Sequence, residues 1–249
     1  MPLTRRSFGR KLRYASFAPH SLVVKHMKTT SDTQNTIEQE LNIFEQDVLE
    51  EFKDNYGNEI EQFIQNMVAT HSEWTKLDEL VKEDDEAGYF SAILFWAFSS
   101  LLHSFKLFCH GYQIPAGNLM RQCVEAIAFS IYSTDKSTGT MKKFREGKIS
   151  TNKAVTKLNK PHVIKKLGLN KEAVKTMLQA QKFYDQFSHP SRMTIASCIS
   201  FETQGNVYVG GSYDKGKKDS YDKEFSLRVS LSRDLPSIIT NIRAQIEKW

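Results

Sequence analysis

The chain has 249 residues, of which 40% are hydrophobic and 25% are charged, so it can bury one sizeable core and is not disordered by composition. Its three cysteines are far apart, which indicates a reducing, cytoplasmic compartment, and no Cys/His spacing typical of a zinc site is present. The longest apolar run, residues 92–109, includes a histidine, a lysine and three serines, which favours a buried core helix over a membrane span. We therefore expect no metal, no cofactor and no membrane association.

The formal net charge of +5 is unevenly distributed along the chain. Residues 1–28 contain seven Lys or Arg and no acid, which leaves 27 basic and 29 acidic residues in the remainder. Residues 37–86 hold 16 acids against three lysines, a net charge of −13, whereas residues 141–182 hold 12 Lys or Arg against two acids, a net charge of +10. The basic segment can bind a polyanion, face solvent, or pack on the acidic segment within one molecule or between two.

The N-terminal residues 1–35 predict a basic, disordered leader. Its segment TRRSFGRK (4–11) resembles a twin-arginine export signal. No sustained apolar stretch follows, because Arg13, Pro19 and His20 interrupt the sequence, so we do not expect export.

A helical domain is expected over residues 36–192. Its first helix begins in an acidic, amphipathic stretch, residues 37–74, where apolar residues recur every three or four positions and most acids lie opposite them. Gly57 is a candidate break in this stretch.

Two long helices follow, over residues 87–112 and 115–132. The first is apolar nearly all round, which is typical of the centre of a bundle. Gly111 is a candidate stop for this helix, and Pro115 suits the first turn of the next. The short connection between them predicts antiparallel neighbours.

The second half of the helical domain begins with a lysine-rich excursion, residues 141–169, in which glycines and a proline predict short helices. Residues 170–190 then predict a longer helix, with Asn170 as its N-cap and an apolar side that faces the bundle.

The C-terminal part, residues 193–249, is expected to pack on the bundle. The β-prone segments 194–202 and 206–214, separated by TQG, predict a short β-hairpin. Residues 225–249 predict a closing helix that Pro236 kinks or breaks. The fold class is therefore mainly α, an up-down helical bundle with a small C-terminal β-hairpin and a closing helix.

The strongest candidate for a site is a charge pair in an otherwise apolar helix. Arg121 and Glu125 are four residues apart and therefore share one helix face. A lone charge inside a bundle is costly, so the two side chains are expected to satisfy each other or a third group. The pair either fixes the register of the helices or forms part of a pocket.

His189 is the second candidate, in the segment YDQFSHPSR (184–192). As a cation it can cap the last carbonyls of the preceding helix. Alternatively it acts as a general acid or base, with Arg192 close by in sequence to hold a phosphodiester. His103 and His110 lie on one face of the central helix, but the spacing of a metal site is absent, so boundary or buried histidines explain them better.

These segments resemble a family of bacterial proteins. The pattern PAGNLMRQCVE (115–125), after a long apolar helix and a short turn, and the later FSHPS (187–191) resemble helical proteins related to the HEPN superfamily and to abortive-infection proteins. The resemblance covers roughly residues 87–192 and implies an up-down bundle of a few helices, often dimeric. Many HEPN proteins are metal-independent ribonucleases of toxin–antitoxin or phage-defence systems, whose site pairs an arginine with a histidine shortly after it on the same helix.

The chain departs from that ribonuclease pattern at the arginine. Asp185 and Gln186 occupy the positions where the arginine before His189 would be expected, and Lys182 is the nearest basic residue on the helix. Arg121 or Arg192 is then the candidate to supply the cation. Alternatively the fold is kept without catalysis, as in HEPN members that bind nucleotides or partners.

Two functions follow from these observations. The first is an RNA-linked interaction module of a bacterial defence or toxin-type system, which acts as a homodimer or with a second protein of that system. The alternative is a metal-independent ribonuclease in which His189 is the acid or base, Arg121 and Arg192 stabilise developing charge, and Glu125 orients Arg121. In both, exposed basic side chains would hold the RNA backbone, namely Lys142, Lys143, Arg145, Lys165, Lys166 and Lys182.

Overall fold

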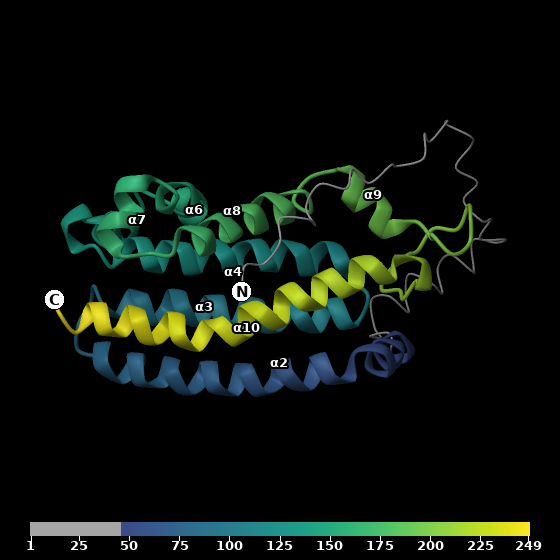
Figure 1. The fold of residues 1–249 in the computed structure, drawn as a ribbon, viewed down its shortest axis with the longest axis horizontal. Coiled ribbons are helices and arrows are strands. Elements are labelled where there is room, and N and C mark those ends of the chain that lie inside the picture. Colours follow the sequence, from purple (N-terminus) through teal and green to yellow (C-terminus); the bar gives the residue numbers. More distant parts are fainter. Residues whose placement is uncertain (1–45) are drawn as a thin grey trace, which may run out of the picture.

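The structure is a computed structural model that describes residues 46–249, so the expected leader and the start of the acidic helix lie outside the described residues. The described chain is mainly helical, as predicted. Its long elements are side by side along one axis (Figure 1), and they are α2 (Gln46–Val81), α3 (Gly88–Cys109), α4 (Gln113–Ser133) and α10 (Lys218–Ile246). Short turns join α2 to α3 and α3 to α4, so consecutive helices run in opposite directions.

The second half of the chain adds a layer over α4, on the side of the bundle opposite α2 (Figure 1). As predicted, the lysine-rich excursion forms short helices, and the Asn170 side chain caps the longer one by accepting from the N–H groups of Glu172 and Ala173. The elements of this part of the chain, in order, are η1 (Lys136–Thr138), α5 (Thr140–Arg145), η2 (Thr151–Lys153), α6 (Ala154–Leu158), α7 (Pro161–Leu167), α8 (Lys171–Asp185), α9 (Arg192–Cys198) and η3 (Lys215–Lys217).

The turn between α3 and α4 is closed by backbone from a distant part of the chain. Gly111 has φ +81°, the left-handed conformation expected where α3 stops. A side chain at Gly111 would collide with the backbone of Ser212, and one at Gly211 would collide with the carbonyl of His110. Glycine is therefore required on both sides, because the two backbones touch.

The predicted C-terminal β-hairpin is wrong. Among residues 46–249 the structure has no strand, and a single antiparallel bridge joins Ile199 to Val207. The first half of the expected hairpin is helical instead, because Ser191 and Thr194 form a capping box that starts α9.

The second half of the expected hairpin is held by other contacts. The buried Asp214 carboxylate accepts from the backbone N–H of Phe201 (2.7 Å) and from that of Gly216 (2.9 Å). Lys217 donates to the carbonyl of Ser197 at 3.0 Å. These side chains and the glycine contact at the α3–α4 turn bind the segment as a loop, so its backbone groups are not free to extend the bridge.

The two expected helix breaks are milder than predicted. At Gly57, α2 continues, with a kink one residue earlier at Tyr56 (φ −135°, ψ 25°). The kink turns the Tyr56 ring onto Phe225, with ring centroids 4.1 Å apart, and lets its hydroxyl donate to Asp222 at 2.8 Å. Pro236 lies inside α10 and does not end it.

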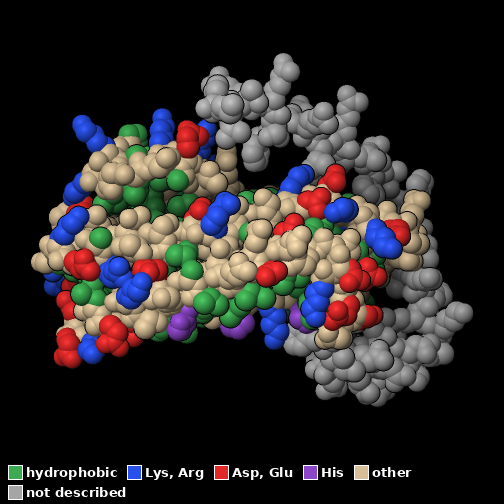
Figure 2. Space-filling view, turned by 60° about the horizontal axis from the view of Figure 1, so that its bottom comes forward, with side chains coloured by type: hydrophobic (Ala, Val, Ile, Leu, Met, Phe, Trp, Pro, Cys, Tyr) green, Lys and Arg blue, Asp and Glu red, His purple; other side chains and the backbone are tan. Residues whose placement is uncertain are grey.

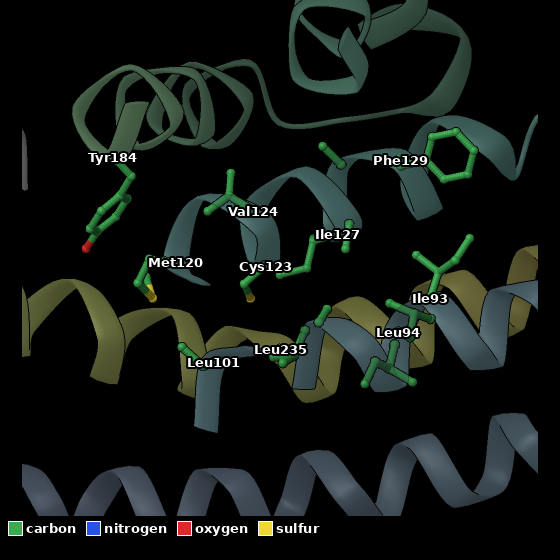
Figure 3. Packing of buried hydrophobic residues seen from close by; sticks show 14 of the residues in the cluster. Ile93, Leu94, Leu101, Met120, Cys123, Val124, Ile127, Phe129, Tyr184 and Leu235 are labelled. Atoms are coloured by element: carbon green, nitrogen blue, oxygen red, sulfur yellow. The ribbon is translucent and has the colours of Figure 1, made fainter. Parts of the chain in front are cut away.

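The core runs along the whole bundle between α3, α4, α10 and the layer above. Figure 3 shows Leu94, Leu101, Cys123 and Ile127 interdigitating there, with Tyr184 reaching down from α8. By length and composition α3 is the one described helix that could cross a membrane, and half of its most apolar window is buried in the bundle. That burial pattern fits the core helix predicted from the sequence.

One buried charge cluster interrupts this apolar core. Arg228 on α10 is 1% exposed, forms an ion pair with Glu224 one turn earlier, and donates to Ser104 of α3 at 3.2 Å. Tyr184 of α8 donates its hydroxyl to Glu224 at 3.0 Å. Burial disfavours the charged guanidinium, but Glu224 more than offsets this, so the pKa of Arg228 lies above its ordinary value. The cluster thus fastens α8, α10 and α3 to one another.

Replacing the acid of this cluster is expected to cost much stability. Glu224→Gln keeps the shape but leaves Arg228 buried without a counter-charge, so we expect a loss of about 3 kcal/mol in the free energy of unfolding. Tyr184→Phe removes only a hydroxyl and should cost about 1 kcal/mol. Urea denaturation followed by circular dichroism measures both, and equal losses for the two variants would contradict the ion pair's importance.

Candidate functional site

The two segments that the sequence singled out lie against each other, where α4 meets the end of α8. Gly117 of α4 has no side chain because the ring of Phe187 fills that space, where a Cβ would lie 2.5 Å from the ring's Cγ. At the next residue of each segment, Ser188 donates to the Asn118 side chain at 2.9 Å. Gly117 and Asn118 of PAGNLMRQCVE therefore form the part of α4 against which the end of α8 packs.

Arg121 continues this contact on the same face of α4. Its Nε donates to Glu125 at 3.0 Å, as the spacing of the pair predicted. One Nη donates to Ser188 Oγ at 2.8 Å and forms an ion pair with Asp185 at 2.9 Å. The arginine therefore joins α4 to the last turn of α8.

Gln181 extends the network to a third element. Its Nε2 donates to Glu125 at 3.0 Å and to the backbone carbonyl of Asn152 in η2, also at 3.0 Å. We call Asn118, Arg121, Glu125, Gln181, Asp185 and Ser188 the α4–α8 network. It fixes α8 and η2, in the middle of the lysine-rich excursion, on the bundle.

The charges of the network are poorly suited to phosphate chemistry. One guanidinium faces two carboxylates, so the cluster has a net charge of −1. The Arg121 side chain is 26% exposed and that of Glu125 only 9%, so the acid cannot swing into solvent without losing its packed position. An anionic phosphate would have to displace Asp185 and would still face Glu125.

His189 and Arg192 do not join this network. Both side chains are exposed, and no hydrogen bond or ion pair within residues 46–249 connects either one to Arg121 or Glu125. The helix-capping role considered for His189 is filled by Ser191, whose hydroxyl donates to the carbonyl of Gln186 at 2.7 Å. The structure thus brings two of the four predicted catalytic side chains together.

The six predicted RNA-binding side chains are all exposed, and each stands in the last turn of its helix. Lys142, Lys143 and Arg145 belong to α5, Lys165 and Lys166 to α7, and Lys182 to α8. Positive charges near a helix C-terminus are favoured by the helix dipole. This explains locally why three separate helices of the layer carry lysine or arginine in their last turn.

The remaining candidates of the sequence have ordinary surroundings. The ring of His103 is exposed and pairs with Ser99, whereas His110 is buried with its Nδ1 2.8 Å from the carbonyl of Lys106. In residues 46–249 no group of three or more His, Cys, Asp or Glu side chains is placed to hold a metal ion. A shallow hollow of ≈310 Å³ is separate from the network and is lined by Asp47, Val48, Glu51, Glu202, Tyr213 and Lys215.

Apart from Glu125, the sequence did not predict which residues surround Arg121. Asn118, Gln181 and Asp185 were not predicted as members. Their signal is helical spacing, because Asn118, Arg121 and Glu125 recur every three or four residues on α4, as do polar residues near the end of α8. No pattern within one helix shows which two polar stripes meet.

No protein-family model matches the chain, and neither does any curated protein or solved structure.

Removal of Arg121 should loosen α8. In Arg121→Met the mostly buried Glu125 loses its counter-charge, so we expect a loss of about 2 kcal/mol in the free energy of unfolding and faster amide exchange in residues 171–188 than in α2. Asp185→Asn, whose side chain is half exposed, is the control and should cost under ~1 kcal/mol. Hydrogen exchange by mass spectrometry checks this, and unchanged protection of α8 would show that the network does not hold it.

Proposed function

We propose that this chain is a HEPN-like, RNA-binding interaction module of a bacterial defence or toxin-type system in the cytoplasm. The observation that carries the proposal is the lysine-rich layer, residues 141–182, which combines a net charge of +10 with an outward position on one side of the bundle (Figure 1). A basic face backed by a rigid scaffold attracts a polyanion over a distance and holds it by its phosphates.

Most cations of this layer are not neutralised by neighbours. The side chains of Lys142, Arg145, Lys165 and Lys182 are exposed and form no hydrogen bond or ion pair with other described residues. Lys166, by contrast, is paired with Asp135. These four side chains are therefore the strongest candidates to contact phosphates.

The acids of α2 do not pair with the cations of the layer within the chain. α2, which carries nine acids and two lysines, lies on the opposite side of the bundle, and no described ion pair links it to residues 141–182. Within the acidic segment, the pKa of the Asp84 carboxyl is lowered by hydrogen bonds from the backbone of Ala87 and Glu86, and then by the nearby Arg145 guanidinium. The acids of α2 itself are not placed to neutralise the layer inside one molecule. The positive charge of residues 141–182 then faces either solvent or a partner. RNA is the partner whose negatively charged backbone fits this excess of positive charge.

In this proposal the α4–α8 network positions the basic layer. Gln181 contacts the backbone of η2, and Arg121 holds the end of α8, next to Lys182. A fixed position of η2 and α8 on the bundle keeps the cations of the layer at a constant spacing, which lowers the ordering cost of binding. A second protein of the same system remains a further candidate partner for this surface.

Neutralising the four free cations should weaken RNA binding and its salt dependence. For a variant with Lys142, Arg145, Lys165 and Lys182 changed to Gln, we expect the magnitude of the slope of log K against log salt to fall by about 3. Each lost contact with a single-strand phosphate contributes roughly 0.7 to this change. The control changes Lys53, Lys76, Lys82 and Lys223 to Gln, which removes the same charge from exposed positions elsewhere. Fluorescence anisotropy with a single-stranded RNA measures both, and equal effects would indicate only a net-charge response.

The ribonuclease alternative makes a different prediction. Because Arg121 is already engaged by two carboxylates and His189 is outside the network, we expect no cleavage of bulk RNA by the purified chain in EDTA. Cleavage that His189→Ala abolishes, while a His162→Ala control retains it, would contradict the non-catalytic module and establish the enzyme.

A further inference from the structure

The lysine-rich layer, residues 141–182, exposes many cations but almost no rings. Its phenylalanine, Phe144, is half-buried, with its ring centroid 4.9 Å from that of Phe129 on α4. The imidazole of His162 is the one exposed ring within these residues. The large hydrophobic side chains that the described chain exposes all lie outside the layer. Figure 2 shows hydrophobic side chains gathered with histidines along the lower edge of the molecule, away from the layer at the upper left, from which Lys and Arg project.

The lack of exposed rings bears on the form of RNA that the layer can hold. Proteins that bind single strands without sequence preference combine a basic groove with aromatic rings on which successive bases stack, and each stacked base contributes about 10-fold in affinity. A single imidazole cannot serve successive bases. The layer therefore offers contacts to phosphates, and a double helix carries about twice as many phosphates along its length as a single strand does.

The cations of α8 form a row along one side of the helix. Lys171, Lys175 and Lys182 are exposed, and the row spans roughly 16 Å at 1.5 Å per residue. The Nζ of Lys175 is 3.7 Å from Glu172, and both side chains are exposed, so this ion pair is weak and can open. The other acid of α8, Asp185, is engaged by the α4–α8 network. The row is therefore free to follow a phosphate backbone.

A second group of cations lies beside this row on other elements. Gln181 of α8 donates to the backbone carbonyl of Asn152 at 3.0 Å, which places η2 against α8. Lys153 follows Asn152 directly, and Lys160 is the residue that precedes α7. Both of these lysine side chains are exposed and form no hydrogen bond or ion pair with other described residues. The layer thus presents cations across a surface, and a double helix presents the phosphates of two strands across a groove.

We propose that the layer binds double-helical RNA, with one strand along the α8 row and the other over Lys153 and Lys160. This inference rests on the proposed RNA binding and names the form of the RNA. The α4–α8 network holds the layer on the bundle, and a double helix is ordered before it binds, so little conformational freedom is lost. A single strand would lose that freedom on a surface that provides no stacking. Because the contacts are to the backbone, recognition follows shape and is independent of sequence.

Fluorescence anisotropy on the full chain distinguishes the two forms of RNA. The probes are a labelled RNA duplex of about 20 base pairs and a labelled oligouridylate of about 20 nucleotides, which does not pair with itself, at the same salt concentration. We expect the duplex to bind at least about 10-fold more tightly, and duplexes of different sequence to agree within about 3-fold. Equal or tighter binding of the oligouridylate overturns the inference and leaves the proposed function standing, whereas binding of neither RNA overturns both.

A double variant tests whether the duplex lies across both groups of cations. Lys153→Gln with Lys171→Gln removes one exposed cation from each group, and the magnitude of the salt slope for the duplex should fall by about 1.8, at roughly 0.9 per lost contact. The control, Lys53→Gln with Lys82→Gln, removes the same charge from α2 and the turn after it and should leave the slope unchanged. Circular dichroism verifies that both variants are folded. An unchanged slope in the first variant, or an equal change in the control, overturns the proposal.

Discussion

The fold depends on charge placed where water cannot reach it. Arg228 is almost wholly buried, and a guanidinium there is tolerated only because Glu224 neutralises it and Ser104 accepts from it. Burial raises the pKa of the Tyr184 hydroxyl well above its ordinary value, so this group stays a neutral donor to Glu224. Because each group needs the others, the helices that carry them are held in one relative position, and the α4–α8 network is built on that position.

The sequence predicted the helical layers because its signals there are local. Gly111 ended α3, Asn170 capped α8, and the apolar character of α3 placed it in the core. The contact between Arg121 and Glu125 followed from helix geometry alone. The predicted hairpin failed because the cap at Ser191 favoured a helix and because long-range backbone contacts, which no local pattern records, held the rest as a loop.

The site was harder to predict, for a related reason. Glu224 and Arg228 have the spacing of an ion pair, but a closing helix expected from residue 225 onward left Glu224 outside it. The proximity of His189 to Ser188 in sequence favoured a shared site, yet adjacent residues at a helix end point in different directions, and only Ser188 faces α4. Which polar groups meet across two helices depends on how each helix is rotated about its own axis. The sequence pattern of a single helix does not specify that rotation.

The separation of acid and base onto opposite layers has a consequence for how the molecule meets a large anion. A body that is positive above α4 and negative along α2 carries a dipole perpendicular to its long helices. In the field of a polyphosphate it experiences a torque as well as an attraction, so it turns before contact. The basic layer then faces the strand, and the orientational search that slows most macromolecular encounters is shortened.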